Sequence, residues 1–282
     1  MKPVAFAYRA PETLEETLAL LEQHGDEATV LAGGQSLVPL LNLRIARPRV
    51  VVDVNRVAGL GGFEAGGGAL RLGALVRTAA VERDPGVAAG WPGLREAIRH
   101  SGHPQIRNRS TVGGSVAHAD PASELPAVLV ALEATVTLRS TAGARELAAA
   151  DFFVGPFTTA RRPDELVTEV RVGARPGASA FREVARRHGD FALVGVYAGV
   201  DLDDGSVGAA RIALCGASPV PLRAVDAEHA LAGRPLDERA IDDAAEAAAA
   251  AVDPWDDLNG PAEYRRDLAR VLTRRTLSAL AV

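Results

Sequence analysis

The chain has 282 residues, of which 48% are apolar and 24% charged, a composition typical of a soluble globular protein of about two domains. Its formal net charge of −5 gives no support for binding to nucleic acid or to an anionic membrane. The single cysteine, Cys215, excludes an internal disulfide and an iron–sulfur cluster held by this chain alone, because such clusters use about four thiolates.

The first residues of the chain contain no apolar stretch of the kind found in signal peptides. No apolar run approaches the roughly 20 residues that a helix needs to span a bilayer. We therefore expect no membrane span, and the lone cysteine fits a reducing compartment such as the cytoplasm.

The first third of the chain predicts a helix followed by a strand–glycine–helix–strand unit. Pro11 is expected in the first turn of the leading helix, and Gly25 closes that helix. A short strand at 28–32 ends in a Gly-Gly pair, after which Ser36 is suited to the N-cap of a second helix. The apolar run 50–54 predicts a buried strand.

The middle of the chain predicts mixed helices and strands around a second Gly-Gly pair. The glycine-rich segment 59–68 predicts a hairpin or a domain junction, and a helix is expected at 94–100. A polar, basic loop at 101–110 leads into the second glycine pair. A helix at 122–133 and a strand at 134–139 follow.

From residue 179 onward the pattern changes to strands followed by helices. The turn Asp203-Asp204-Gly205 is a strong hairpin signal. Strands are predicted at 180–185, 192–202 and 207–214. Helices are predicted at 222–231, 237–252 and 261–280. This part of the chain therefore predicts a small antiparallel sheet covered by helices.

The common phosphate-binding and hydrolytic signatures are missing from the sequence. It has no GxxxxGK[ST], no GxGxxG after a strand, no GxSxG, no HExxH and no CxxC. His118 and Asp120 lie two residues apart, but no third residue has the spacing of a metal ligand, so we interpret them as a polar loop pair. We expect neither a metal site nor a catalytic acid, base or nucleophile.

Two glycine segments remain, Ala32 to Arg44 and Arg107 to Pro126, and each joins a Gly-Gly pair to a hydroxyl residue. Glycine lets backbone N–H groups approach a phosphate, and a helix that begins there adds unpaired amides. Two such segments facing each other could hold a pyrophosphate without a lysine. Either segment alone could equally be a tight turn, and the physical argument does not identify the ligand.

Three stretches carry a resemblance to a known family: AGGQSLVPLLNLRIARPRVVVDVN, QIRNRSTVGGSVAHADPASELPAVLVAL and FREVARRHGDFALVGVYAGV. They resemble the FAD-binding medium subunit of molybdenum hydroxylases, the family of carbon monoxide dehydrogenase and xanthine dehydrogenase. The resemblance implies an α+β fold with a two-lobed FAD-binding domain of the vanillyl-alcohol-oxidase-like type at residues 1–174. Its lobes would be 1–57 and 58–174, and a C-terminal domain of a three-stranded antiparallel sheet with helices would follow at 175–282.

The resemblance also implies cofactor-binding residues. The first segment would wrap the FAD pyrophosphate through Leu31, Ala32, Gly33, Gly34, Gln35, Ser36 and Leu37. Gly102, Ile106 and Ser110 would form an adenine and pyrophosphate wall, and Thr111, Gly113, Gly114, Ser115 and Ala117 would contact the flavin end and the phosphates. Ser123 and Glu124 occupy the position that bonds ribose or ribityl hydroxyls, and Leu166 and Arg182 are further candidates.

Phe191 matches an aromatic residue that covers one face of the isoalloxazine in the carbon monoxide dehydrogenase branch. The alternative interpretation of Phe191 is a plain core aromatic. This chain departs from the common pattern at Ser115, where many relatives have Asn, at Glu124, where Asp is more frequent, and at Phe191, which lacks a tyrosine hydroxyl. These departures bear on the flavin potential more than on FAD binding.

The implied function is electron transfer, in which FAD takes electrons from a small subunit with two [2Fe–2S] clusters and passes them to an external acceptor. Substrate would be hydroxylated in a large molybdenum-cofactor subunit, and the whole would be a dimer of heterotrimers. We expect non-covalent FAD, because neither glycine segment places a His or Cys at the ring. Alternatives are a self-contained flavin oxidase and a non-catalytic scaffold subunit.

Four arginine pairs could form partner interfaces or simply lie on the solvated surface: Arg161-Arg162, Arg186-Arg187, Arg265-Arg266 and Arg274-Arg275. We hypothesise that Arg186-Arg187 lies near a partner or the flavin entrance.

Overall fold

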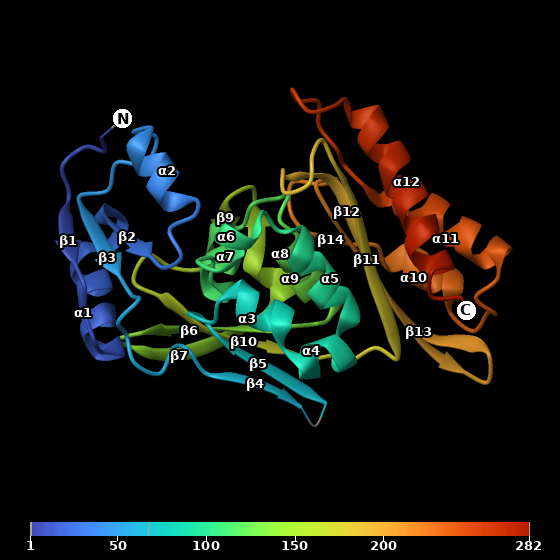
Figure 1. Cartoon of the computed structure of the whole chain (residues 1–282), viewed down its shortest axis with the longest axis horizontal. Coiled ribbons are helices and arrows are strands. Elements are labelled where there is room, and N and C mark those ends of the chain that lie inside the picture. Colours follow the sequence, from blue (N-terminus) through green and yellow to red (C-terminus); the bar gives the residue numbers. More distant parts are fainter. Residues whose placement is uncertain (1, 67, 282) are drawn as a thin grey trace.

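The computed structural model describes residues 2–66 and 68–281. The chain forms three parts that follow one another along its longest axis (Figure 1). We name them the N-lobe (residues 2–57), the central lobe (58–174) and the C-terminal domain (175–281).

The N-lobe is a three-stranded parallel sheet with strand order β1-β3-β2 and a helix packed against it. Its elements are β1 (Ala7–Arg9), α1 (Leu14–His24), η1 (Gly25–Glu27), β2 (Ala28–Leu31), α2 (Leu37–Asn42) and β3 (Val50–Asp53). We had predicted Pro11 in the first turn of α1, but it lies before that helix. Thr13 is the N-cap instead, because its side chain accepts a hydrogen bond from the Glu16 amide.

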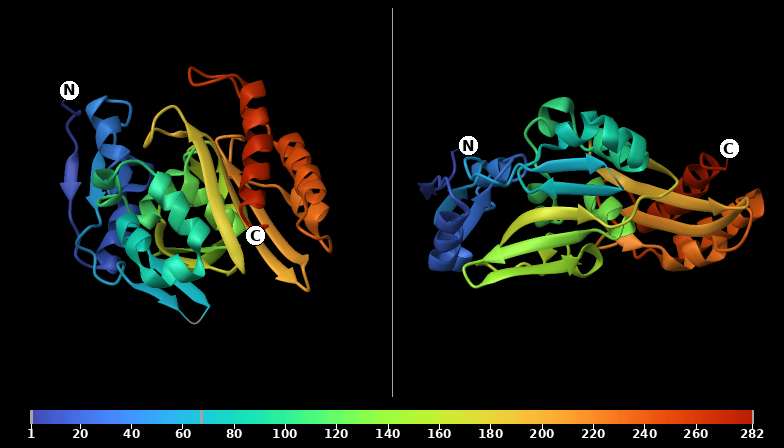
Figure 2. Two further views of the ribbon diagram at one scale, coloured as in Figure 1. Left: turned by 45° about the vertical axis from the view of Figure 1, so that its right-hand side comes forward. Right: turned by 90° about the horizontal axis from the view of Figure 1, so that it is seen from below.

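The central lobe is a five-stranded antiparallel sheet with strand order β4-β5-β10-β6-β7. Most of its helices gather on one side of this sheet (Figure 2). Its elements are β4 (Phe63–Gly66), β5 (Ala69–Gly73), α3 (Thr78–Arg83), α4 (Pro85–Gly90), α5 (Pro92–His100), α6 (Pro104–Arg107), α7 (Val112–His118), α8 (Glu124–Ala131), β6 (Thr135–Ser140), β7 (Gly143–Ala148), α9 (Ala149–Phe152), β8 (Phe153–Gly155), β9 (Thr158–Thr159) and β10 (Leu166–Val172).

Two predictions for the central lobe need comment. The segment 59–68, predicted as a hairpin or a domain junction, contains β4, which forms a hairpin with β5; residue 67 lies outside the described residues. The second Gly-Gly pair, for which a tight turn was one interpretation, lies in the first turn of α7. The preceding segment, 101–110, contains the short helix α6.

The C-terminal domain is an antiparallel sheet with strand order β11-β12-β13-β14. Its elements are β11 (Ala178–Ala185), β12 (Ala192–Asp203), β13 (Ser206–Cys215), β14 (Leu222–Arg223), α10 (Val225–Leu231), α11 (Glu238–Ala251) and α12 (Ala262–Ser278). The prediction of three strands was wrong by one, because the first residues of the predicted helix 222–231 pair with β13 instead. Two residues are too few to give a strand signal in the sequence.

Both faces of this second sheet are buried. Tyr197, Ala213 and Cys215 belong to the core of the central lobe, which includes α5 and α8, whereas Val196 and Ile212 pack under α10, α11 and α12. Because side chains alternate along a strand, one sheet serves two cores. The C-terminal domain is thereby fixed against the central lobe.

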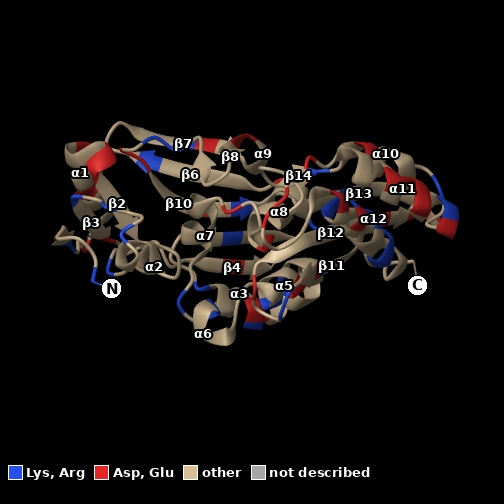
Figure 3. Ribbon diagram, turned by 90° about the horizontal axis from the view of Figure 1, so that it is seen from above, with Lys and Arg blue, Asp and Glu red and all other residues tan. Residues whose placement is uncertain are grey.

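Charged residues of both signs are scattered over the elements, with acidic residues prominent on α1 and α11 (Figure 3). Among residues 2–66 and 68–281, no helix combines the length and the apolar character that crossing a bilayer requires.

Candidate functional site

A cavity of about 540 Å³ lies where all three parts of the chain meet. Its walls include β2 and α2 from the N-lobe, α7 and β10 from the central lobe, and the β11–β12 loop. Of the twenty predicted cofactor-binding residues, all but Leu31 and Arg182 line it. Leu31 packs behind the first glycine segment, where a side chain on Gly34 would meet it, and Arg182 is exposed on β11.

The first glycine segment presents unused backbone amides to this cavity. Within the described chain, the amides of residues 33–37 donate no hydrogen bond to protein atoms, although the segment lies in the cavity wall. Gly34 has φ of +75°, a conformation that suits glycine, and the Gln35 side chain donates to the Gly33 carbonyl at 3.0 Å. Successive amides that lack partners form a binding site for an anion.

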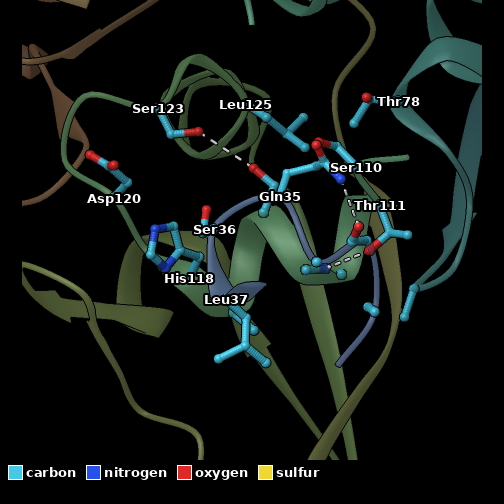
Figure 4. Close-up of a pocket in the computed structure, with 18 of the residues that line it drawn as sticks. Gln35, Ser36, Leu37, Thr78, Ser110, Thr111, His118, Asp120, Ser123 and Leu125 are labelled. Atoms are coloured by element: carbon cyan, nitrogen blue, oxygen red, sulfur yellow. Dashed lines mark hydrogen bonds between the residues drawn. The ribbon is translucent and has the colours of Figure 1, made fainter. Parts of the chain in front are cut away.

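Ser36 stands at the N-cap of α2 as predicted, but its hydroxyl makes no capping hydrogen bond. Figure 4 shows Ser36 and Gln35 among the polar residues that line the cavity, together with Ser110 and Ser123. The Ser36 hydroxyl is therefore available to a ligand, as are the amides beside it.

The second glycine segment differs from the first because several of its amides are hydrogen-bonded within the protein. The amides of Val112 and Gly113 donate to the carbonyls of Val76 and Ala74, and the Gly114 amide donates to the Thr111 hydroxyl at 3.1 Å. A Cβ on Gly113 would lie 2.5 Å from the Cβ of Ala74, so glycine is needed for close packing of α7. Thr111 and Ser115 line the cavity, so this segment offers hydroxyls to it.

The two segments touch each other through their backbones. A Cβ on Gly33 would lie 2.6 Å from the Arg109 carbonyl oxygen and 2.8 Å from the Ser110 Cα. Only glycine permits this approach, because real Cβ atoms essentially never come so close to backbone atoms. The close contact sets the width of the cavity between the N-lobe and the central lobe.

Hydroxyls and one buried acid complete the polar lining. The Ser115 and Ser123 hydroxyl oxygens lie 3.4 Å apart. Glu124, at the start of α8, is only 4% exposed, and burial, followed by the nearby Glu183 carboxylate, raises its pKa to about 8. Glu124 is therefore mostly protonated at neutral pH and can donate a hydrogen bond from its carboxyl group.

Phe191 lies in the cavity wall with 71% of its surface exposed, so the interpretation as a core aromatic is wrong. Its neighbours Gly189 and Asp190 also line the cavity, and Arg187 pairs with Asp190 at 3.1 Å. Arg187 therefore lies beside the cavity lining, whereas Arg186 donates to the Leu258 carbonyl at 3.5 Å.

Two further arginine pairs contain residues of different exposure. Arg265 is 2% exposed and donates to the carbonyls of Leu193 and Gly216 and to Asp257, so neither the interface nor the solvated-surface interpretation holds for it. Arg274 pairs with Asp242 across α11 and α12 at 2.6 Å.

Sequence reasoning missed Arg161 as a cavity residue. One of its terminal nitrogens donates to the carbonyls of Arg162, Pro163 and Glu165, and it forms no ion pair within the described chain. Burial lowers the pKa of its guanidinium, and Glu165 opposes this shift. An adjacent arginine pair gives no local signal that distinguishes such a residue from surface charge.

His118 and Asp120 also line the cavity. The His118 ring lies 5.2 Å from that of Phe157, and the Asp120 carboxylate accepts from the Ala122 amide at 2.9 Å. Over the two described ranges, no cluster of three His, Cys, Asp or Glu residues is arranged to hold a metal ion.

Two families cover most of the chain. Residues 4–174 match the FAD binding domain in molybdopterin dehydrogenase, and residues 179–280 match the CO dehydrogenase flavoprotein C-terminal domain. The chain is 42% identical to the 6-hydroxypseudooxynicotine dehydrogenase complex subunit alpha of Paenarthrobacter nicotinovorans, over 99% of this chain and 95% of that one. It is 36% identical to the carbon monoxide dehydrogenase medium chain of Hydrogenophaga pseudoflava, over 99% and 98%.

Solved structures agree with this. A carbon monoxide dehydrogenase structure from Hydrogenophaga pseudoflava superposes with a TM-score of 0.95 at 38% identity and covers 99% of this chain and 98% of that one. Quinoline 2-oxidoreductase from Pseudomonas putida 86 gives 0.94 at 38% identity, with coverage of 100% and 98%. The chain therefore belongs to the family of FAD-binding medium subunits of molybdenum hydroxylases, to which the carbon monoxide dehydrogenase medium chain also belongs.

Proposed function

We propose that this chain binds FAD in the three-walled cavity and passes electrons through it, while a partner subunit oxidises the substrate. The row of unpartnered amides at residues 33–37 carries this proposal. Such amides in a cavity wall need an acceptor, and a pyrophosphate supplies several acceptor oxygens at once. The family match supports FAD as the molecule that brings them.

The other lining residues fit the remainder of FAD. The exposed ring of Phe191 offers an apolar face to an isoalloxazine, and Ser115, Ser123 and the protonated Glu124 offer hydrogen bonds to hydroxyls. Bound FAD would supply two-electron and one-electron redox chemistry. The task of this chain is to orient the cofactor, limit its contact with water and adjust the local electrostatics. We propose as FAD-binding residues the eighteen predicted residues that line the cavity, together with Leu31 and Arg182.

The electrons would come from a small subunit with [2Fe–2S] clusters, and substrate oxidation would take place in a large molybdenum-cofactor subunit. Among the relatives, one is a medium subunit of nicotine 6-hydroxylase and another is a caffeine dehydrogenase subunit, so the family supports such an assembly for this chain. We also propose a dimer of heterotrimers, a cytoplasmic location and non-covalent FAD. The division at 174/175 and a vanillyl-alcohol-oxidase-like architecture for the FAD-binding part remain proposals as well.

An anaerobic mixing experiment tests the direction of electron flow. The FAD-loaded chain is mixed with its dithionite-reduced [2Fe–2S] partner, freed of excess dithionite, and the flavin absorbance is followed. We expect the flavin to bleach on mixing. Candidate aldehyde or N-heterocyclic substrates added to the FAD-loaded chain alone should leave it oxidised.

Bleaching by a substrate with no partner present would support the alternative of a self-contained oxidase. An oxidised flavin that the reduced partner cannot bleach, although the two chains bind each other, would support the scaffold alternative.

A further inference from the structure

Two polar side chains join the two glycine segments outside the cavity wall. The Asn55 side chain donates to the Ala32 carbonyl at 2.8 Å, and the Arg77 guanidinium donates to the Asn55 side-chain oxygen at 2.7 Å. Arg77 also donates to the Arg109 carbonyl at 2.6 Å. Ala32 begins the first segment, and Arg109 immediately precedes Ser110 and Thr111. The two backbones are thus tied through one continuous chain of hydrogen bonds.

Each member of this chain of bonds is itself held in place. Asp53 accepts from the Asn55 amide at 2.9 Å and from its side chain at 2.7 Å, which fixes the direction of the side-chain amide. Asp53 also accepts from the Tyr8 hydroxyl at 2.6 Å. Arg77 lies at the N-cap of α3, where its neighbour Thr78 donates its amide to the Ser110 carbonyl. The connection is therefore preorganised from both lobes.

The connection joins two lobes that also share an apolar contact. The apolar cluster around Leu18, Leu21 and Val52 of the N-lobe includes Leu60 and Leu166 of the central lobe, whose main core lies elsewhere, around Leu70, Leu72 and Leu94. Arg77 and Asn55 add hydrogen bonds beside this apolar contact. Because the apolar contact remains when these bonds are lost, their loss should change the spacing of the two glycine segments more than the folding of the lobes.

We propose that Arg77 and Asn55 are positioning residues that hold the first glycine segment against the second and thereby keep FAD in the cavity. This inference rests on the proposed function, because FAD is the ligand whose retention it concerns. The bonds lie at the point where Gly33 approaches the Arg109–Ser110 backbone. If they are absent, the gap can open and the amides of residues 33–37 no longer face a closed opposite wall.

The test compares FAD release from wild type, Arg77→Met, Asn55→Leu and the double variant. The purified chains are loaded with FAD, and dissociation rates are measured from the recovery of flavin fluorescence on dilution. Arg83→Met is the matched control, because Arg83 lies at the other end of α3 and, among the described residues, its side chain is hydrogen-bonded to Asn108 alone, at 3.2 Å. Melting temperatures of the FAD-free chains are measured in parallel.

We expect Arg77→Met and Asn55→Leu each to raise the FAD dissociation rate by about 10-fold or more, as loss of a charge-assisted hydrogen bond does. The double variant should release FAD no faster than the worse single variant, because both act through one connection. Arg77→Lys, which keeps one donor, should recover part of the loss. The FAD-free chains should melt close to wild type.

Dissociation rates that match those of Arg83→Met, or that change only in proportion to a lowered melting temperature, would overturn the inference. Additive effects in the double variant would also overturn it. A wild-type chain that binds no FAD would contradict the proposed function itself, an outcome that is distinguishable because it precedes any comparison of variants.

Discussion

The contact between Gly33 and the second segment makes Gly33→Ala the most informative single substitution. The new Cβ would lie 2.6 Å from the Arg109 carbonyl oxygen and 2.8 Å from the Ser110 Cα, and neither backbone atom can rotate away. Ordinary contact begins near 3.4 Å, so the two segments must separate by several tenths of an ångström. Overpacking of this kind costs about 1–3 kcal/mol.

This cost should appear mainly in FAD affinity. Without FAD the segments relieve the clash by moving apart, whereas FAD binding requires them to close again. The Kd for FAD should therefore rise by about 5- to 150-fold, which is the same free energy expressed as a ratio. A fluorescence titration of the FAD-free chain measures this directly.

Gly61→Ala is the matched control, because a Cβ there would meet nothing within 4 Å. It should leave the Kd unchanged. If Gly33→Ala bound FAD as tightly as wild type and melted at the same temperature, the two segments would not set the width of the site, and the reasoning would be refuted.

Three further predictions follow from individual side chains. Glu124 has a folded pKa of about 8 against an ordinary value of 4.5, so the folded state binds an extra proton between these two pH values. The unfolding free energy should therefore fall as pH rises through that window, and denaturant titrations of Glu124→Gln should show a flatter pH profile. Phe191→Ala should change the unfolding free energy by less than about 0.5 kcal/mol, because the residue is 71% exposed. Bound flavin should nevertheless become more accessible to an iodide quencher, and an unchanged quenching constant would argue against stacking of Phe191 on the flavin. Arg265→Met should lower the unfolding free energy by about 2–4 kcal/mol in chemical denaturation, because it leaves the Leu193 and Gly216 carbonyls and Asp257 without their donor. A decrease below about 0.5 kcal/mol would count against a structural role for these hydrogen bonds.

Local sequence patterns predicted most of the elements near the site. The apolar run before the first Gly-Gly pair is β2, the helix after Ser36 is α2, and the strands predicted at 180–185 and 192–202 correspond to β11 and β12. These features depend on periodicity and on glycine, which act over a few residues. The family resemblance added the residues that line the cavity, which no local pattern could bring together.

The sequence could not predict features that depend on distant backbone. The amides of Val112 and Gly113 are occupied by carbonyls of residues 76 and 74, so two similar glycine pairs have different roles. Arg161 and Arg265 each belong to an Arg-Arg pair, yet one lines the cavity and the other is buried. Their surroundings are set by tertiary packing, which the local sequence around an Arg-Arg pair does not indicate.

The most direct test of the central claim is a titration of the purified wild-type chain with FAD, followed by visible absorbance and flavin fluorescence. We predict saturation near one equivalent, with flavin absorbance bands that remain with the folded protein on gel filtration and are released by acid. The Gly34→Asp/Gly114→Asp double variant, if folded, should not bind. A folded wild-type chain that takes up no FAD, alone or with its partner subunits, would contradict the account.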